Sequence, residues 1–307
     1  MPCLSFFSCE MIMKNGCLNL KPLTIAFIKI TFKCFGLLPL PILRFCGKCL
    51  GYFFWGLSPK YRFQFNKNWN QAKKFDKNRK LVNSKKLKAV VHPTVFFLES
   101  IKIWTQVNCN NFVVRENEGL LRELRGKPQG LICLSPHLGS FELAPRLVSE
   151  VMPMTVLYHP PKMPELNQLL LEYRTKPDLD FVATNYSGVK LLLKVLKNGG
   201  SVGILPDQVP PRGAGKWTPF FGKMAYTSTL VVKLAKITSA QIVWITCLRY
   251  KKGWKFSVEL WDQSFFCKEI DENEILINLN KKMESLIYEN PEEYLWGYDR
   301  FKKPKIN

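Results

Sequence analysis

The stretch GLICLSPHLGSFE, residues 130–142, joins a short apolar run to two residues that can exchange protons. Leu131–Leu134 predicts a buried strand, and His137 follows shortly after its end. Glu142 comes next, with four residues between it and the histidine. In this arrangement the imidazole is a candidate general base that removes a proton from a hydroxyl, while the carboxylate fixes its tautomer. The spacing alone is a weak signal, because chance produces such pairs often.

Strands and helices alternate along the rest of the chain after Leu120. Strands are predicted at Leu131–Leu134, Met154–Leu157, Phe181–Ala183 and Ser201–Leu205, with helices at Phe141–Glu150, Glu165–Thr175 and Gly188–Lys197. A helix at Leu230–Ile237, a hairpin of Gln241–Tyr250 with Trp254–Trp261, and a helix at Glu272–Glu289 follow. This pattern predicts an α/β domain with a layered, mostly parallel central sheet flanked by helices. Ligands of such sheets collect beyond the carboxyl ends of strands, so His137 and Asp207 are expected to face one crevice.

The amino-terminal segment, residues 1–60, is apolar and aromatic but is broken repeatedly by charges. Its longest uncharged run after residue 23 has about ten residues, whereas a membrane span needs about 20. Lys29/Lys33 and Arg44/Lys48 are spaced i,i+4, so each pair lies on one helical face. We expect an apolar helical membrane anchor made of two short helices that lie in an anionic membrane surface. A tilted span and a buried amphipathic hairpin are the alternatives.

The formal net charge of the 307-residue chain is +21, and most of it lies near the amino end. Residues 1–90 contain 17 Lys and Arg against Glu10 and Asp76, an excess of 15. Such an excess indicates an anionic partner, and a lysine-rich genome would not confine it to one end. The basic stretch from Lys60 to Lys88 has no motif that reads a nucleic acid groove, so we expect an anionic membrane and no nucleic acid. Residues 61–307 are expected to form the second, functional domain.

The cysteines and histidines give no metal signal. The ten cysteines are scattered, and several lie in apolar runs, so we interpret them as reduced, buried thiols. Cys46 and Cys49 have the spacing of a redox or zinc pair, but no second such pair or nearby histidine accompanies them. His92, His137 and His159 are far apart in the sequence.

Three further stretches carry candidate site residues. Asp207 and Gln208 follow the strand Ser201–Leu205, and the loop after them is rich in proline and glycine. Asp207 is either a site acid beneath a mobile lid or the start of an ordinary Asx turn. Arg174, on a predicted helix, either binds a phosphate or an oxyanion or is an exposed surface arginine. The segment 291–302, taken alone, is typical of aromatic packing.

Taken in order, these motifs resemble the late acyltransferases of lipid A biosynthesis in Gram-negative bacteria, the lauroyl/myristoyl transferase family. The resemblance covers most of the chain and rests on the basic apolar amino end, the His137-x4-Glu142 box, Arg174, the block Pro206-Asp207-Gln208 that ends in Phe220-Phe221-Gly222, and the terminal signature Pro291-Glu292-Glu293-Tyr294-Leu295-Trp296 with Arg300-Phe301-Lys302. The box is moderately specific by itself and becomes strongly so when joined to the other two blocks.

The resemblance implies a fold like that of the glycerolipid acyltransferases and an O-acyltransferase activity. The enzyme would move a fatty acyl chain from an acyl carrier protein to a hydroxyl of a Kdo-bearing lipid A precursor, a phosphorylated glycolipid. His137 would be the base, Glu142 would orient it, Arg174 would contact the acceptor's phosphate or the oxyanion, and Asp207 and Gln208 would bind substrate. No metal or dissociable cofactor is implied, and the expected location is the bacterial inner membrane with the active site facing the cytoplasm.

The same resemblance suggests that backbone N–H groups at Gly139 and Ser140 hold the oxyanion, since helix amino ends favour negative charge. Two rival functions stay open. One is a glycerophospholipid or other glycolipid acyltransferase, although enzymes of the glycerophosphate type usually carry aspartate where this chain has Glu142. The other is a non-catalytic, membrane-attached basic protein.

Overall fold

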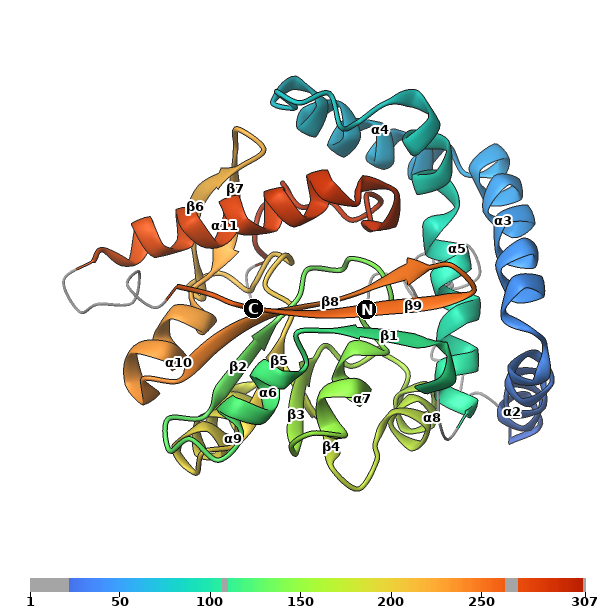
Figure 1. Cartoon of the computed structure of the whole chain (residues 1–307). Helices are drawn as coiled ribbons and strands as arrows, with labels where there is room; N and C mark the ends of the chain where they lie inside the picture. Colours follow the sequence, from blue (N-terminus) through green and yellow to red (C-terminus); the bar gives the residue numbers. More distant parts are fainter. Residues whose placement is uncertain (1–21, 107–109, 263–269, 306–307) are drawn as a thin grey trace.

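The computed structural model describes residues 22–106, 110–262 and 270–305, and its centre is a seven-stranded sheet (Figure 1). The strands are β1 (Val113–Glu116), β2 (Leu131–Leu134), β3 (Met154–Tyr158), β4 (Leu179–Ala183), β5 (Ser201–Ile204), β8 (Gln241–Tyr250) and β9 (Gly253–Leu260). Their order across the sheet is β1-β9-β8-β2-β5-β3-β4. Every adjacent pair is parallel except β8 and β9, so the prediction of a mostly parallel sheet is confirmed.

Helices cover both faces of this sheet (Figure 1), which explains why the central strand β2 is apolar throughout. In β2 all four residues are buried: Ile132 and Leu134 belong to one core cluster, and Leu131 and Cys133 to the other. The helices after the first strand are α6 (Gly119–Leu124), α7 (Ala144–Ser149), α8 (Pro164–Arg174), α9 (Tyr186–Lys197), α10 (Leu230–Thr238) and α11 (Glu272–Glu289). A short 3-10 turn, η1 (Asn110–Phe112), precedes that strand, and another, η3 (Pro291–Glu293), follows α11. The predicted helices are confirmed, although α7 begins three residues later than expected.

Within the described residues four helices precede the sheet, and they pack onto it as part of the same body. They are α2 (Pro22–Leu37), α3 (Leu40–Leu57), α4 (Pro59–Lys74) and α5 (Asn83–Thr105), and Figure 1 shows α3 running along α5 beside the sheet. Phe32, Leu40 and Leu43 are buried in the same core cluster as residues of β2 and β8. The expectation of an apolar anchor helix is therefore not supported for the described part of the segment, and residues 1–21 lie outside the described residues.

The cationic stripe predicted on these helices is only partly present. Arg44 does not face a membrane: its Nε donates to Glu99 at 2.6 Å and its Nη2 to the Gly253 carbonyl at 2.8 Å. Lys33 and Lys48 are exposed as the prediction requires, whereas Lys29 is half-buried and pairs with Glu172. Across the described ranges, no helix combines the length and the apolar character that crossing a bilayer demands.

Two further regions have regular secondary structure. α4 buries an aromatic stripe, in which Phe65 and Trp69 are stacked at 5.7 Å, so the stretch from Lys60 is a packed helix. The expected mobile lid contains a β-hairpin, β6 (Gly215–Phe220) and β7 (Lys223–Ser228), whose two-residue turn has positive φ at Phe221 and Gly222. Asn280 of α11 holds both of its strands through the hydroxyl groups of Thr218 and Thr227.

Close approach between α3 and α5 depends on glycines. A Cβ at Gly47 would lie 2.7 Å from the Cα of Val95, and one at Gly51 would lie 2.8 Å from the Cα of Val91. The buried side chain of Thr94 also joins the two helices, because its Oγ1 donates to the Gly47 carbonyl at 2.7 Å. Small residues at positions 47 and 51 thus set the distance between the two helix axes.

We expect Gly51→Ala to destabilise the protein by about 1–3 kcal/mol, because the new methyl group meets backbone atoms of α5. Gly56→Ala, on the same helix, is the matched control, since nothing lies within 4 Å of a Cβ there. That variant should be neutral or more stable by up to about 1 kcal/mol through helix propensity. Urea unfolding of both variants measures the difference, and equal midpoints would contradict the packing argument.

Candidate active site

His137 is held at the carboxyl edge of the sheet by the chain's own carboxyl-terminal segment. Leu138 forms an antiparallel bridge with Tyr294, and the His137 carbonyl accepts from the Leu295 N–H at 3.2 Å. The Gly139 N–H donates to the Glu293 carbonyl at 2.9 Å. The loop after β2 therefore has its backbone fixed by residues more than 150 positions away in the sequence.

The imidazole of His137 lies between Asp207 and Gln208, which follow the neighbouring strand β5. Its Nδ1 is 2.7 Å from Asp207 Oδ1, and its backbone N–H donates to Oδ2 of the same carboxylate at 3.0 Å. Because Nδ1 faces a carboxylate, it carries the proton, and Nε2 is left with its lone pair. Gln208 Nε2 donates to that lone pair at 2.8 Å. The expectation that His137 and Asp207 lie together beyond the ends of their strands agrees with these contacts.

Asp207 is 2% exposed, and its surroundings keep it ionised. Burial by itself raises the pKa of this carboxyl, but the charge and hydrogen bonds of His137, together with the charge of Arg300, outweigh it and lower the pKa below its ordinary value. The Tyr294 hydroxyl also hydrogen-bonds to Asp207. Arg300 is itself fixed by the carbonyl of Tyr226, to which its Nη1 donates at 2.8 Å. A permanently charged Asp207 keeps the imidazole in one tautomer and stabilises its protonated form.

Glu142 lies in a second cluster and does not contact the imidazole. Its two carboxylate oxygens accept from Arg174, one from Nε at 2.9 Å and the other from Nη2, and Trp104 Nε1 donates to the first oxygen at 3.0 Å. Arg174 is 2% exposed and lies over the rings of Trp104 and Phe181. The prediction that Glu142 orients His137 differs from this geometry, because both ring nitrogens of the histidine have other partners.

Two other expectations change with the geometry. Arg174, expected either to bind substrate or to lie exposed on the surface, is a buried partner of Glu142. The N–H groups of Gly139 and Ser140, expected to hold an oxyanion, donate to the carbonyls of Glu293 and Cys247. Neither amide is available to a reacting carbonyl, so that prediction is wrong.

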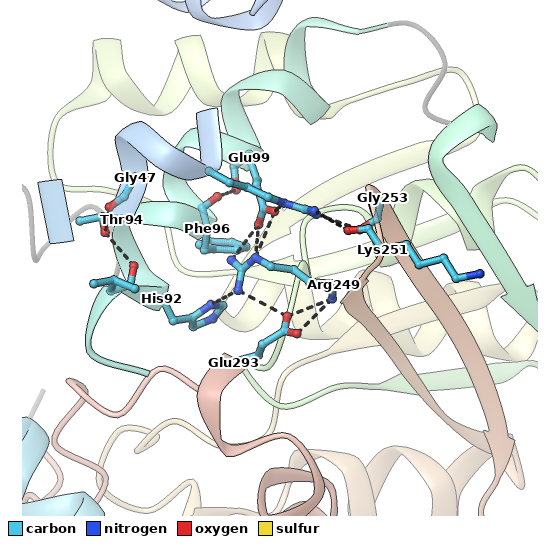
Figure 2. A network of polar contacts seen from close by, with 12 residues as sticks. Gly47, His92, Thr94, Phe96, Glu99, Arg249, Lys251, Gly253 and Glu293 are labelled. Atoms are coloured by element: carbon cyan, nitrogen blue, oxygen red, sulfur yellow. Dashed lines mark hydrogen bonds and ion pairs between the residues drawn. The ribbon is translucent and has the colours of Figure 1, made fainter. Parts of the chain in front are cut away.

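A buried ionic network supports the loop of His137 from the side of α5 (Figure 2). Arg249 of β8 pairs with the fully buried Glu99 of α5 at 2.7 Å, and its backbone N–H donates to Glu293 at 3.1 Å. Arg249 Nη1 also donates to His92 Nδ1 at 2.8 Å. Glu293 thus joins this network through its carboxylate and joins the His137 loop through its carbonyl. The network links α5, β8 and the carboxyl-terminal segment at one point.

Sequence reasoning missed Trp104, Glu99 and Arg249. A signal for Glu99 was present, because it lies between Leu98 and Ser100 in a largely apolar helix, and a charge there must find a buried partner. The sequence contained no such signal for Trp104, because the role of its indole N–H depends on the position of Glu142, to which it donates a hydrogen bond.

In the part of the chain that the structure describes, no three His, Cys, Asp or Glu side chains gather as metal ligands. The cysteines behave as expected at Cys133 and Cys247, which are buried, and burial raises the pKa of the Cys133 thiol to about 12. The expectation of burial is wrong for Cys34 and Cys49, which are exposed.

The fold and this arrangement of His, Asp and carboxyl-terminal signature define a family. Residues 13–303 match the bacterial lipid A biosynthesis acyltransferases, and the chain belongs to that family. The resemblance drawn from the motifs is thereby confirmed.

Several bacterial relatives are similar to part of the chain. The lipid A biosynthesis palmitoleoyltransferase of Escherichia coli (strain K12) is 26% identical over 191 residues, 60% of either chain. The lipid A biosynthesis acyltransferase 2 of Shigella flexneri is 23% identical over 190 residues, and the lipid A biosynthesis lauroyltransferase of E. coli (strain K12) is 24% identical over 183 residues, 59% of either chain. The chain spans about 60% of the length of these relatives.

The His92 environment predicts an acid-sensitive fold. Burial, and then the charge of Arg249, lower the pKa of His92 well below 6.5. The folded state therefore stays unprotonated at His92 while the unfolded state takes up a proton near pH 6.5. Stability is full above that pH and falls below it, by up to about 1.4 kcal/mol per pH unit until the folded pKa is reached.

We expect His92→Gln, which keeps an acceptor for Arg249, to flatten this acid-side loss between pH 7 and pH 5. Urea unfolding at several pH values in that window, with wild type and variant compared, measures the slope difference. Parallel curves for the two proteins would show that His92 titrates alike in both states.

Proposed function

We propose that this protein transfers a fatty acyl chain from an acyl carrier protein thioester to a hydroxyl group of a Kdo-bearing lipid A precursor. The observation that carries the proposal is the His137–Asp207 pair at the carboxyl edge of the sheet, 2.7 Å between Nδ1 and Oδ1. Family membership supports the reaction class, and the names of the relatives support lipid A as the acceptor class. Acyl carrier protein as the donor comes from the resemblance of the motifs.

The proposed chemistry begins at Nε2 of His137. This nitrogen takes the proton of the acceptor hydroxyl as the oxygen attacks the thioester carbonyl. The carbon–sulfur bond then breaks, an ester forms, and the imidazolium returns its proton to the departing thiolate. Asp207 stabilises the imidazolium, as an aspartate does in the Ser-His-Asp triad. Gln208 occupies Nε2 in the structure, so the acceptor hydroxyl replaces its amide group when substrate binds.

Glu142 and Arg174 act on the site as positioning residues in this proposal. Their ion pair fixes the end of the His137 loop to α8, and Trp104 fixes it to α5. Since both side chains are buried against each other, they assist His137 by holding its backbone in place.

We further propose that α2, α3 and α4 rest on the anionic cytoplasmic surface of the bacterial inner membrane, with the active site facing the cytoplasm. Their outer faces expose large apolar side chains among lysines, an arrangement typical of helices that lie in an interface. The exposed fractions are 70% for Phe27, 67% for Phe45, 60% for Phe53, 64% for Leu57 and 70% for Phe63.

The activity is tested by incubating a Kdo-lipid A precursor with acyl carrier protein thioesters of several chain lengths. Membranes carrying the wild type should add the mass of one acyl chain, and His137→Ala should lose this product, since it lacks the base. Mass spectrometry of the lipid reads both outcomes. Wild-type transfer to lysophosphatidic acid or glycerol phosphate instead of the lipid A precursor would support the glycerophospholipid alternative. Cells with unchanged lipid A in a His137→Ala strain would favour a non-catalytic role.

The different partners of the Asp207 and Glu142 carboxylates give a second prediction. In Asp207→Asn, one amide group must serve both the Nδ1–H and the backbone N–H of His137. The NH2 group of the new asparagine then faces one of these two N–H donors. The tautomer of His137 that carries its proton on Nδ1 is therefore no longer favoured. We expect kcat to fall by about 10²- to 10⁴-fold while the fold is kept.

Glu142→Gln is the matched comparison, because it removes a charge of the same sign at a similar depth. It leaves Arg174 buried without its counter-charge, so we expect a loss of stability of about 3–5 kcal/mol and a smaller fall in kcat per folded molecule. Urea unfolding and single-turnover kinetics separate the two effects. A larger fall in kcat for Glu142→Gln at unchanged stability would restore Glu142 as the partner of the imidazole.

A further inference from the structure

A cleft of about 440 Å³ opens between α2, the end of α5 and the segment after α8. Lys29 and Lys33 line it from α2, and Lys176 lines it from the segment after α8. Tyr173 adds a hydroxyl group to the lining, and Trp104 and Ile30 add apolar surface. The cleft is thus lined by three cations and by no acidic side chain among its described residues.

The positive charge of this cleft is only partly neutralised. Lys29 pairs with Glu172 at 2.7 Å, but both side chains are about half exposed, so the pair is weak. Lys33 and Lys176 have no ion-pair partner within residues 22–106, 110–262 and 270–305. Two cations are therefore left to attract an anion.

A fourth cation lies beneath the cleft. Arg146 donates to the carbonyls of Ile103 and Gln106 at the end of α5 and to the Tyr173 carbonyl on α8 at 2.7 Å, so it fixes the two sides relative to each other. Burial, and then the charge of Arg146, lower the pKa of Lys176. The second of these causes is repulsion between two cations, which a bound anion would relieve.

The surroundings of the cleft favour an amphiphile over a free ion. Ile30, a wall of the cleft, is 61% exposed, and Phe27 and Leu37 on the same helix are 70% and 79% exposed. A ligand with a phosphorylated head in the cleft could lay acyl chains along this apolar surface. The other wall, Trp104, donates its indole N–H to Glu142, so the cleft is one side chain away from the pair that holds the His137 loop.

We propose that this cleft is the subsite for a phosphate monoester on the glycolipid acceptor, bound by Lys33 and Lys176 with help from Lys29. The proposal rests on the proposed acyl transfer for the identity of the lipid, while the phosphate chemistry rests on the cleft itself. Arg174, buried against Glu142, does not supply this contact. The cleft binds the phosphate near the loop of His137 and so orients the acceptor hydroxyl toward the base.

The kinetic test uses the full chain with Lys33→Glu and Lys176→Glu combined, and Lys190→Glu, an exposed lysine on α9, as the charge-matched control. Two acceptors are compared that differ only in the phosphate monoester. We expect the double variant to raise KM for the phosphorylated acceptor by about tenfold or more, with kcat kept and little change for the dephosphorylated acceptor. Lys190→Glu should match the wild type with both. Circular dichroism melting checks that all three proteins are folded.

A binding arm keeps the subsite testable if no acyl transfer is found. Glucosamine 1-phosphate, glucosamine and inorganic phosphate are each titrated into detergent-solubilised wild type and double variant, with 31P NMR or calorimetry as the readout. Binding of the sugar phosphate by the wild type alone supports the subsite even when the transfer reaction fails. Inorganic phosphate that binds as tightly as the sugar phosphate would reduce the cleft to a simple anion site and overturn the lipid assignment.

Two further outcomes would overturn the proposal. An equal rise in KM for both acceptors would mean that the lysines serve another partner, such as the acidic surface of the acyl donor. Unchanged KM together with unchanged binding in the double variant would mean that the cleft takes no phosphate.

Discussion

The pairing of Arg249 with Glu293 is the contact on which the site depends. Glu293 accepts the Arg249 backbone N–H with its carboxylate and the Gly139 N–H with its carbonyl, so one residue joins strand β8 to the histidine loop. Arg249 in turn is held by Glu99, which is fully buried in α5. Each charge is tolerable in the interior only because the others are present. The position of His137 therefore depends on the mutual neutralisation of charges from α5, β8 and the carboxyl-terminal segment.

The sheet and half of the site could be predicted from the sequence. A short apolar run such as Leu131–Leu134, followed by a predicted helix, indicates a buried parallel strand. Parallel strands bring their carboxyl ends to one edge of the sheet. That reasoning placed His137 beside Asp207 correctly. The terminal signature around Tyr294 could be named by resemblance, but its bridge to Leu138 could not be inferred from pattern.

What the sequence could not settle is which charge pairs with which. Spacing puts Glu142 near His137 along the chain, yet three residues of irregular backbone turn its carboxylate toward Arg174, and Asp207 takes the imidazole instead. The expectation that Arg44 faces a membrane fails for a similar reason. Helical spacing does not reveal that Glu99 is buried on the neighbouring helix, where it pairs with Arg44. Packing between distant segments decides which residues form long-range ion pairs, and the local sequence pattern does not show this packing.

The bridge between Leu138 and Tyr294 also sets an order of events in folding. Strands β2 and β5 can pair while the later part of the chain is still being made, since their contacts do not involve it. The histidine loop bonds to the Cys247 carbonyl of β8 through Ser140, but His137 and Gly139 gain their backbone partners only from residues 293–295, and contacts between such distant positions form slowly. A nascent chain would thus pair strands β2 and β5 before its histidine loop is fixed, and the candidate active site would be completed last.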